Sequence, residues 1–301
     1  MFLTDFIKES IEKLGSIYPS SESRSIVMML CESVLGTKNY THIVEPAYEI
    51  PVSKEEVLNV DVQRLMQGEP IQYVIGKGTF CGLDFQVTRD VLIPRPETEM
   101  LCKEAIKIGN MIYRMRSPYG KKAKPVTILD LCTGSGCIAW TLALSVPTAK
   151  VTAVDISEKA LEVARNQNFI QKMKGSNAVA PVFYKVDILG EEFPVQEKFD
   201  IILSNPPYIM NSEKTDMRKN VLEYEPEIAL FVPDDDPLLF YKSIAKWSNR
   251  LMEKEGFGMT EINEKLGKET ESVFKKEGFS NTDITKDFYD KDRFIIYRRQ
   301  S

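Results

Sequence analysis

The sequence predicts an α/β protein in which a small helical bundle precedes a doubly wound, mostly parallel sheet. Two observations predict this class. Apolar residues recur at helical spacing through residues 1–67, and from residue 126 onward strand-like apolar runs alternate with helical segments. Strands separated by helices of this length are typical of a parallel sheet that is covered on both faces.

The N-terminal region is expected to form about four helices and no strand. Thr4 is predicted to cap the first helix, and Pro19 to separate that helix from the second. The run from Ser53 to Glu56 has the form of a capping box, which predicts a further helix that ends at Gly68. The apolar stripes of such a bundle form a core of its own, and a bundle in front of an enzyme can also dock a partner.

A change of pattern follows the bundle. Gly76, Gly78 and Gly82 separate short alternating runs, which predicts a β-hairpin that joins the bundle to the next domain. We therefore expect a helical domain at residues 1–70, a β-hairpin linker at residues 71–93 and an α/β domain at residues 94–301.

The α/β domain is expected to open with a helix. Pro96 suits the first helical position, and Glu97 and Glu99 suit the positive end of the helix dipole. Together with Arg95, these two acids either line the mouth of a substrate site or serve only the helix start. The helix is predicted to reach residue 113, and the basic stretch 114–125 is predicted to be an exposed loop.

Strands and helices then alternate to the end of the chain. Helices are predicted at residues 137–145, 157–174, 237–254 and 264–277. The last two strands are short, which suggests an antiparallel pair at one edge of the sheet. The strands are predicted at residues 126–131, 150–154, 181–186, 200–204, 256–262, 283–286 and 293–298.

The first strand of this domain runs directly into a glycine loop, Cys132-Thr133-Gly134-Ser135-Gly136. Its two glycines allow a tight turn and the close approach of a ligand to the backbone. The third glycine of the dinucleotide-binding pattern is replaced by Ala139, and no Walker lysine follows, so a triphosphate site is not expected. The loop fits a nucleoside with an uncharged or cationic tail.

Acidic residues stand at the ends of the next two strands. In a Rossmann-like unit an acid at the position of Asp155 accepts hydrogen bonds from ribose hydroxyls, although it can also simply cap the helix that starts near Ser157. Asp187 is predicted to accept a hydrogen bond from an adenine amino group, with Ile188 against the ring. These residues, the glycine loop and Asn205 make up the expected cofactor site.

The fourth strand ends in Asn205-Pro206-Pro207-Tyr208. Two prolines remove two backbone donors and fix two φ angles, so a stiff loop holds the nearby carbonyls in place. With the Asn205 amide and the Tyr208 ring they form a rigid set of acceptors for a planar NH2-bearing group. We expect these four residues to bind the substrate and to carry the catalysis; taken alone, the run is equally compatible with a proline-rich turn.

The order of these features resembles the S-adenosylmethionine-dependent methyltransferases with a seven-stranded (class I) sheet. Asn-Pro-Pro-Tyr resembles the motif of those members that methylate planar amino or amide nitrogens. A narrower resemblance, over nearly the whole chain, is to the peptide chain release factor glutamine methyltransferases, the PrmC/HemK family. It rests on four runs: Gly68-Glu69-Pro70-Ile71-Gln72-Tyr73, Ile93-Pro94-Arg95-Pro96-Glu97-Thr98-Glu99, Asn205-Pro206-Pro207-Tyr208-Ile209 and Glu225-Pro226-Glu227-Ile228-Ala229-Leu230.

The resemblance implies S-adenosylmethionine as cofactor and peptide chain release factors as protein partners. It implies methylation of the glutamine side-chain nitrogen in the Gly-Gly-Gln motif of those factors, with the helical domain helping to dock them. Two residues depart from the family's pattern. Cys132 stands where the loop usually begins with glycine, and Ile188 stands where an aromatic residue is common. Both departures concern contacts to the cofactor rather than the reaction.

The composition limits the compartment and the partners. A net charge of −5 argues against a broad, non-specific nucleic-acid binder. Five cysteines without a CxxC pair and a single histidine, His42, assemble no zinc pattern and suit a reducing compartment. The N-terminus does not resemble a signal peptide, and no run is long enough to span a membrane. We expect a cytoplasmic monomer that requires no membrane, metal or nucleic acid.

Two other functions remain open on the residues alone. The nearest alternative enzyme methylates an exocyclic amino group of a DNA or ribosomal RNA base, with the same Asn-Pro-Pro-Tyr grip on a flipped base. The acidic balance argues against it. A non-catalytic scaffold is a different class of alternative, and the intact glycine loop, Asp155 and Asn205 argue against that.

Overall fold

The computed structural model describes residues 1–117, 124–190 and 192–299 of the chain. Their backbone divides into two compact units. The first comprises Met1–Lys77 together with Met217–Glu225, and the second comprises Gly78–Asp216 and Pro226–Ser301. Within the described residues, no helix is both long enough and apolar enough to cross a lipid bilayer.

The first unit is helical. Its apolar core includes Phe6, Leu14, Val27, Leu30 and Leu58, all at most 2% exposed, because each helix turns one apolar face inward. Its helices are α1 (Leu3–Leu14), α2 (Ser20–Leu35), α3 (Thr41–Val44), α4 (Val52–Met66), α5 (Ile71–Ile75) and α10 (Lys219–Tyr224).

The segment around α10 belongs to this unit although it lies far along the chain. Arg218 forms an ion pair with Glu22 at 3.2 Å, and the Tyr224 hydroxyl donates to the backbone carbonyl of Gln67 at 3.0 Å. These two contacts attach α10 to α2 and to the end of α4.

Two predicted helix caps are wrong. Helix α1 begins at Leu3 with Phe2 at the N-cap position, so Thr4 lies inside the helix. Helix α4 begins at Val52, and Pro51 occupies the N-cap position, so the expected capping box at Ser53 does not form. The extended backbone of Pro51 starts the helix earlier than the polar residues alone indicate, because proline fixes its own φ.

The predicted hairpin linker is only partly correct. Residues 71–75 form helix α5 rather than a strand, and Gly76 ends that helix in the left-handed conformation at φ 68°. The Arg64 side chain donates to the carbonyls of Tyr73 and Val74, at 3.3 and 3.2 Å, which satisfies carbonyls at the helix end. The hairpin itself is shorter, with β1 (Lys77–Phe80) and β2 (Leu83–Gln86).

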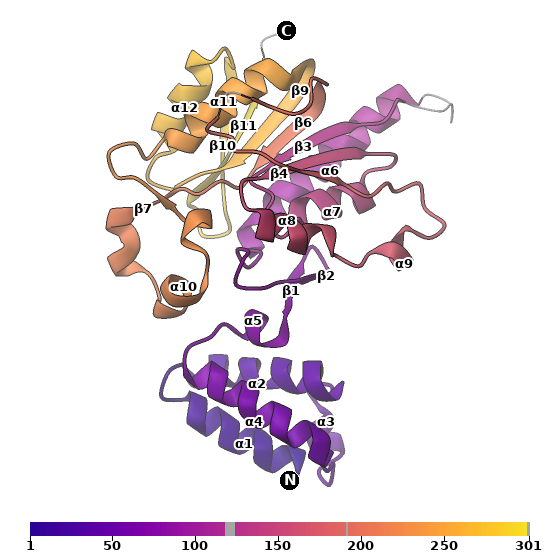
Figure 1. Cartoon of the computed structure of the whole chain (residues 1–301), viewed down its shortest axis with the longest axis vertical. Helices are drawn as coiled ribbons and strands as arrows, with labels where there is room; N and C mark the ends of the chain where they lie inside the picture. Colours follow the sequence, from indigo (N-terminus) through magenta and orange to yellow (C-terminus); the bar gives the residue numbers. More distant parts are fainter. Residues whose placement is uncertain (118–123, 191, 300–301) are drawn as a thin grey trace. The chain divides into compact units, whose positions relative to one another are not determined.

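The second unit contains the predicted seven-stranded sheet, in the order β10-β11-β9-β6-β3-β4-β5 (Figure 1). Five strands are parallel, and β11 pairs antiparallel with both β9 and β10, which confirms the predicted antiparallel edge. The strands are β3 (Thr127–Leu131), β4 (Lys150–Asp155), β5 (Val182–Lys185), β6 (Phe199–Ser204), β9 (Met252–Glu261), β10 (Asn281–Lys286) and β11 (Asp292–Arg298).

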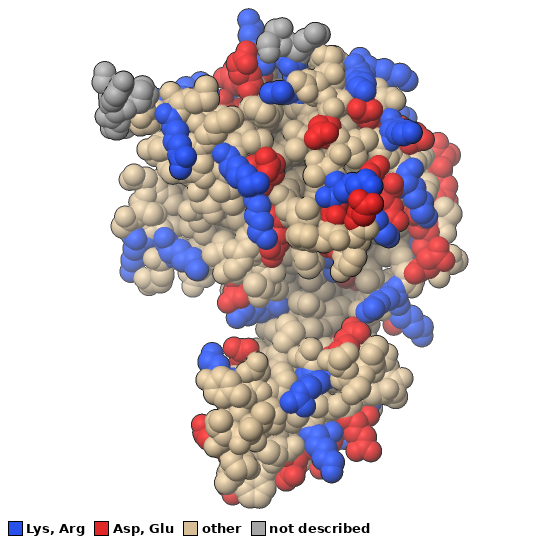
Figure 2. Space-filling model, turned by 180° about the vertical axis from the view of Figure 1, so that it is seen from behind, with Lys and Arg blue, Asp and Glu red and all other residues tan. Residues whose placement is uncertain are grey.

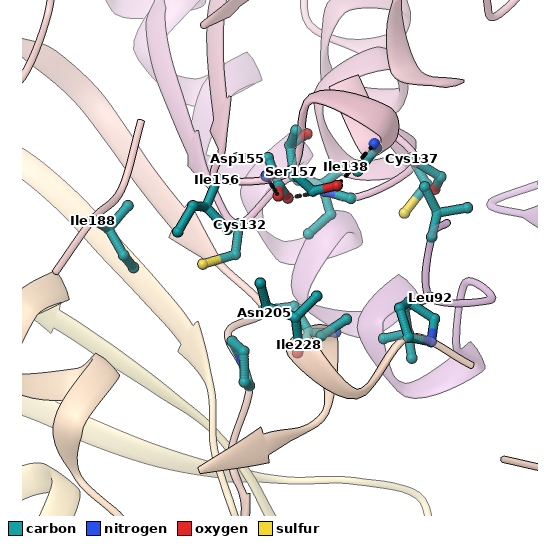
Figure 3. A pocket seen from close by; sticks show the side chains of 18 of the residues that line it. Leu92, Cys132, Cys137, Ile138, Asp155, Ile156, Ser157, Ile188, Asn205 and Ile228 are labelled. Atoms are coloured by element: carbon teal, nitrogen blue, oxygen red, sulfur yellow. Dashed lines mark hydrogen bonds between the residues drawn. The ribbon is translucent and has the colours of Figure 1, made fainter. Parts of the chain in front are cut away.

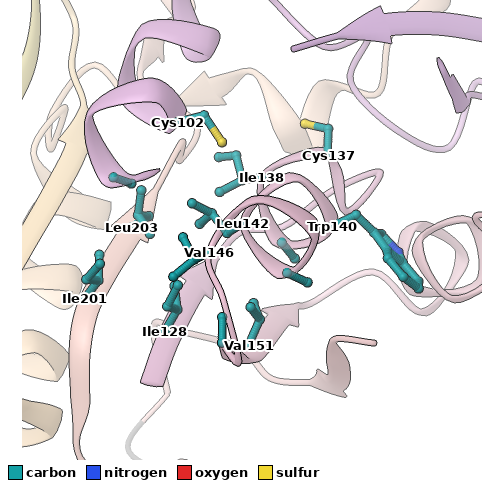
Figure 4. Close-up of a cluster of buried hydrophobic side chains, with 14 of the residues drawn as sticks. Cys102, Ile128, Cys137, Ile138, Trp140, Leu142, Val146, Val151, Ile201 and Leu203 are labelled. Carbon is teal, nitrogen blue, oxygen red and sulfur yellow. The ribbon is translucent and has the colours of Figure 1, made fainter. Parts of the chain in front are cut away.

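Helices cover both faces of this sheet, because alternate residues of each central strand point to opposite sides. On one side Ile128 and Ile201 pack with the apolar residues of helices α6 and α7 (Figure 4). On the other side Leu129 and Ile202 pack with those of α11 and α12. The helices of this unit are α6 (Pro96–Arg116), α7 (Cys137–Ser145), α8 (Glu158–Arg165), α9 (Ile170–Met173), α11 (Leu239–Leu251) and α12 (Gly267–Lys276).

Several boundaries differ from prediction. Helix α6 continues to Arg116, so the start of the basic stretch 114–125 is helical, while residues 118–123 lie outside the described residues. The helix predicted at 157–174 is two shorter helices, α8 and α9. A short parallel pair, β7 (Ile209–Met210) and β8 (Phe231–Val232), was not predicted. It follows the Asn-Pro-Pro-Tyr segment and brings residues 226–229 back toward it.

Candidate active site

Loops at the carboxyl ends of β3, β4, β5 and β6 surround a cavity of about 270 Å³. Ligands of doubly wound sheets bind at this edge, because the loops that leave parallel strands converge there. Figure 3 shows Asp155 and Ile156 lining one part of the cavity and Asn205 and Ile228 lining another. Six residues before and at the start of α6 also line it: Asp90, Val91, Leu92, Pro94, Arg95 and Thr98.

The glycine loop has the backbone that its sequence predicts. Gly134 and Gly136 adopt positive φ angles of 54° and 77°, a region that favours glycine. Cys132 is also in this region, at φ 62°. A glycine would adopt that conformation without strain, whereas a side chain such as that of Cys132 adopts it at a cost. Burial raises the pKa of the Cys132 thiol well above its usual range, so the thiol that lines the cavity is neutral.

A buried acid beneath the loop supports it. The Thr133 hydroxyl donates to the Asp130 carboxyl at 2.6 Å, and Asp130 is fully buried in β3. Burial raises the pKa of the Asp130 carboxyl to about 7. Asp130 was not predicted as a site residue, although an acidic residue inside an apolar strand, just before a glycine loop, is a signal that the sequence contains.

Asp155 connects the end of β4 to the glycine loop. Its carboxylate accepts hydrogen bonds from the backbone N–H of Gly134 and of Ser157, both at 2.9 Å (Figure 3). Burial raises the pKa of the Asp155 carboxyl, an effect that these two hydrogen bonds only partly offset. Each carboxylate oxygen keeps a further lone pair, so Asp155 can still accept from hydroxyl groups of a ligand in the cavity.

Asp187 and Ile188 follow the end of β5 and line the same cavity. The Asp187 carboxylate accepts from the backbone N–H of Leu189 at 2.9 Å, which fixes the turn. Ile188 is 4% exposed, and its carbonyl accepts from the Trp247 indole N–H at 2.8 Å. Ile188 and Ile156 thus offer apolar surface to a flat ring, while Asp187 offers an acceptor near it.

The Asn205 side chain lies at the opposite part of the cavity from Asp155. Its Nδ2 donates to the Thr98 hydroxyl at 3.0 Å, and that hydroxyl donates to the Glu261 carboxyl at 2.6 Å. The Tyr208 hydroxyl donates to the other oxygen of Glu261 at 2.9 Å. The two ends of the Asn-Pro-Pro-Tyr segment are therefore joined through one carboxyl group on β9.

The predicted site residues divide into two groups. Gly136, Pro206 and Tyr208 do not line the cavity: Gly136 packs against Ala164, and the Tyr208 hydroxyl points to Glu261. The assigned roles of all these residues stay predictions. Those that line the cavity are Cys132, Thr133, Gly134, Ser135, Asp155, Asp187, Ile188, Asn205 and Pro207.

Besides Asp130, Thr98 and Glu261 were not predicted as site residues from the sequence. Both are buried, at 2% and 1% exposure. In the run Arg95 to Glu99 the two glutamates are the conspicuous acids. Glu99, however, binds Lys103 and the Cys81 backbone, and Arg95 is the charged residue of that run that lines the cavity. An acid at the end of a buried strand is the only local signal for Glu261.

The chemistry of the cavity suits a nucleoside with a cationic tail. Its wall offers the carboxylates of Asp155 and Asp187, the apolar side chains of Ile156 and Ile188, and the open backbone of Gly134. A Cβ added at Gly134 would meet no protein atom within 4 Å, so a ligand has room to approach the loop. S-adenosylmethionine presents ribose hydroxyls, an adenine ring and a sulfonium, and these residues fit it.

Potential metal ligands are dispersed among the described residues. No group of three or more histidine, cysteine, aspartate or glutamate side chains in the described part of the chain is placed to hold a metal ion. Figure 2 shows acidic and basic side chains interspersed on the viewed face rather than a continuous basic stripe.

Two family models match this chain in separate regions. The model described as the PrmC N-terminal domain matches residues 5–76, and the model described as the methyltransferase small domain matches residues 117–226. The first match falls in the helical unit, and the second includes the glycine loop, Asp155, Asp187 and the Asn-Pro-Pro-Tyr segment.

Curated relatives align with nearly the whole chain. The release factor glutamine methyltransferase of Flavobacterium psychrophilum is 38% identical over 299 residues, which cover 98% of each chain. That of Bacteroides thetaiotaomicron is 36% identical over 297 residues, or 99% of each chain. That of Bacillus subtilis is 36% identical over 248 residues, or 81% of each chain.

A solved structure shares the fold. The catalytic domain of human Mettl16 superposes with a TM-score of 0.51 and 13% sequence identity, covering 82% of this chain and 83% of that one. At this level of identity the likeness concerns the fold alone.

Proposed function

This chain belongs to the family of release factor glutamine methyltransferases, and we propose that its Asn-Pro-Pro-Tyr segment holds the glutamine side chain that receives the methyl group. The chain is an S-adenosylmethionine-dependent protein-glutamine N-methyltransferase whose substrates are peptide chain release factors. The observation that carries the assignment of the site is that Asn205 lines the same cavity as the glycine loop, Asp155 and Asp187.

An amide nitrogen is a poor nucleophile, because its lone pair is delocalised into the carbonyl. S-adenosylmethionine supplies an electrophilic methyl group on a sulfonium, so the protein must mainly hold the nitrogen in line with that group. Orientation of this kind contributes several kcal/mol, and roughly 7–11 kcal/mol in the best model systems. The rigid Pro206-Pro207 backbone suits this task, since two fixed φ angles leave the loop little freedom.

We assign the two acceptors for the substrate amide to Asn205 Oδ1 and the Pro206 carbonyl. Each accepts one N–H of the glutamine side chain, which favours an electron-rich, more pyramidal nitrogen as the new N–C bond forms. The nitrogen becomes acidic once it carries the methyl group, so its proton can leave to solvent afterwards. Tyr208 stabilises the segment through its hydrogen bond to Glu261, and we propose that its ring packs beside the amide.

On the cofactor side, the roles follow the positions of the acceptors. Asp155 accepts from ribose hydroxyls, and Asp187 accepts from the adenine amino group. Ile188 and Ile156 pack against the ring. The backbone of the glycine loop, from Cys132 to Gly136, contacts the tail.

The helical unit at Met1–Lys77 is proposed to dock the release factor. It matches the PrmC N-terminal domain and carries exposed apolar side chains on α4, including Val52 at 86% and Val60 at 55% exposure. We further propose that the protein acts as a monomer in the cytoplasm, where its five unpaired cysteines stay reduced.

The direct test is to incubate the protein with S-adenosylmethionine labelled in its methyl group and three acceptors. These are a release factor with Gly-Gly-Gln, the same factor with Gly-Gly-Ala, and ribosomal RNA. We expect the label on the glutamine amide of the first acceptor alone. Label in the Gly-Gly-Ala factor would contradict the glutamine assignment, and label in the RNA would support the base-methylating alternative.

A further inference from the structure

Four polar side chains form one hydrogen-bonded chain behind the substrate part of the cavity. Tyr208 donates to Glu261 Oε1 at 2.9 Å, Thr98 donates to Glu261 Oε2 at 2.6 Å, and Asn205 Nδ2 donates to Thr98 Oγ1 at 3.0 Å. Thr98 lies in the first turn of α6, Glu261 at the end of β9, and Asn205 just after β6. Three elements thus converge on one amide group.

The direction of this chain is set at Glu261. Burial raises the pKa of the Glu261 carboxyl, and the hydrogen bonds from Thr98 and Tyr208 together with the charge of Arg293 act against that rise. In its ionised form this carboxylate only accepts hydrogen bonds, and the distance of 2.6 Å to Thr98 is in the range of a hydroxyl that donates to a carboxylate. The hydrogen of the Thr98 hydroxyl is therefore committed to Glu261. Toward Asn205, Thr98 Oγ1 offers only lone pairs, so the amide must present its NH2 to Thr98.

The same constraint orients the other end of the amide. The oxygen and nitrogen of an Asn side chain differ little in size, so packing alone does not choose between the two orientations. With Nδ2 directed to Thr98, Oδ1 faces away from it. Among the described residues Oδ1 has no hydrogen-bond partner, while Asn205 lines the cavity.

We propose that Thr98 and Glu261 are positioning residues that lock the Asn205 amide with its oxygen toward the substrate. This lock makes the site select a group that donates hydrogen bonds, an NH2, and reject a carboxylate of the same shape. The inference rests on the proposed function and deepens it, since it explains how glutamine is distinguished from glutamate.

A second contact supports a positioning role for the end of β9. Asn263, two residues after Glu261, donates from its Nδ2 to the backbone carbonyl of Tyr208 at 3.1 Å. Glu261 itself accepts the two hydrogen bonds from Thr98 and Tyr208. Asn263 is itself held in place, because its backbone N–H donates to the Tyr241 hydroxyl at 3.0 Å. The Asn-Pro-Pro-Tyr segment is therefore held at both ends by residues 261–263.

The test compares Thr98→Val, which keeps the shape but removes the hydroxyl, with Thr98→Ser, which keeps the hydroxyl. Thr270→Val is the matched control, because the Thr270 hydroxyl is buried without a hydrogen-bond partner among the described residues. We expect Thr98→Val to lower kcat on a Gly-Gly-Gln release factor by about 10- to 100-fold, with cofactor affinity within about threefold. Thr98→Ser should recover at least about a third of the wild-type kcat, and Thr270→Val should equal the wild type.

Selectivity supplies a readout that a merely structural role would not change. A Gly-Gly-Glu release factor should inhibit the wild type weakly, because Asn205 Oδ1 faces its carboxylate. In Thr98→Val the amide can turn its NH2 outward, so the inhibition constant should fall by about tenfold. An unchanged ratio between the Gly-Gly-Glu inhibition constant and the Gly-Gly-Gln KM would overturn the proposal.

A double-variant cycle completes the test. If Thr98 acts through Asn205, Thr98→Val should not lower kcat any further in an Asn205→Ala background. If the two substitutions instead lower kcat by factors that multiply in the double variant, the lock is refuted. If Thr98→Val does not give a cooperative thermal transition, Thr98→Ala replaces it in the same comparisons. Wild-type protein that fails to label Gly-Gly-Gln would refute the proposed function, whereas labelling with a wild-type-like Thr98→Val would refute the lock alone.

Discussion

The proposed cofactor half and the proposed substrate half of the cavity differ in how far apart along the chain their interacting residues lie. In the cofactor half, Asp155 bonds to Ser157 two residues away and to Gly134 across 21 residues. In the substrate half, Asn205 bonds to Thr98 across 107 residues, and Thr98 bonds to Glu261 across 163. Residues 132–136, 155, 187 and 188 line or support the cofactor half, and residues 205–208 with Thr98 and Glu261 line or support the substrate half.

This difference shows which parts of a site can be recognised from a short stretch of sequence. A glycine loop followed by a strand-end acid is one supersecondary unit, so its residues keep a fixed spacing in the sequence. The orientation of one amide in the substrate half depends on α6 and β9, which meet β6 only in the folded sheet. We therefore expect substitutions in the two halves to affect different measurements.

The largest expected effect is the loss of turnover in Asn205→Ala. Removing the side chain deletes the acceptor that we propose for the substrate amide, and we expect kcat to fall on the order of a thousandfold. Cofactor affinity should stay within about tenfold of the wild type, since the cofactor half is intact. The measurement is methyl transfer to a Gly-Gly-Gln release factor, with calorimetry for the cofactor. Asn249→Ala, at an exposed position on α11, is the control; an Asn205→Ala enzyme with wild-type turnover would exclude the catalytic role.

Asp155→Ala should have the opposite pattern. Losing hydrogen bonds to a charged acceptor costs about 1.5–3 kcal/mol, so we expect cofactor affinity to fall by roughly 10- to 100-fold. Calorimetric titration with S-adenosylmethionine measures the change, and turnover at saturating cofactor should fall less than affinity does. Asp283→Ala, on the exposed edge strand β10, is the matched control. Wild-type affinity in Asp155→Ala would rule out the assignment of the ribose to this acid.

The smallest expected effect is on stability, in Gly134→Ala and Gly136→Ala. The two variants separate backbone strain within the loop from packing against a distant residue. Both glycines have positive φ, but a Cβ at Gly136 would lie 3.0 Å from the Ala164 Cβ, whereas one at Gly134 would meet nothing within 4 Å. Gly134→Ala should lower the free energy of unfolding by about 1 kcal/mol from backbone strain alone. Gly136→Ala should lower it by about 2–3 kcal/mol, since overpacking adds to the strain. Denaturant titration measures both, and equal losses would contradict the packing role of Gly136.

Much of the fold could be predicted from periodicity. The seven strands, the antiparallel edge and the helix that begins at Pro96 follow from patterns of two to four residues, which the chain displays directly. One error occurs where a group from another helix replaces a local one. Residues 71–75 form a helix whose last carbonyls accept from Arg64, and no alternation of apolar residues reveals that donor.

The positions of the polar residues at the strand ends could be predicted from the sequence alone. Gly134, Asp155, Asp187 and Asn205 each terminate or follow an apolar run, and parallel strands must bring their carboxyl ends to one edge. The presence of Asn205 at the site is a matter of sequence, but the direction of its amide is not. That direction depends on Thr98 and Glu261, buried groups on two other elements whose hydrogen-bonding capacities leave one arrangement. Only packing of the sheet against α6 brings these three side chains within hydrogen-bond distance.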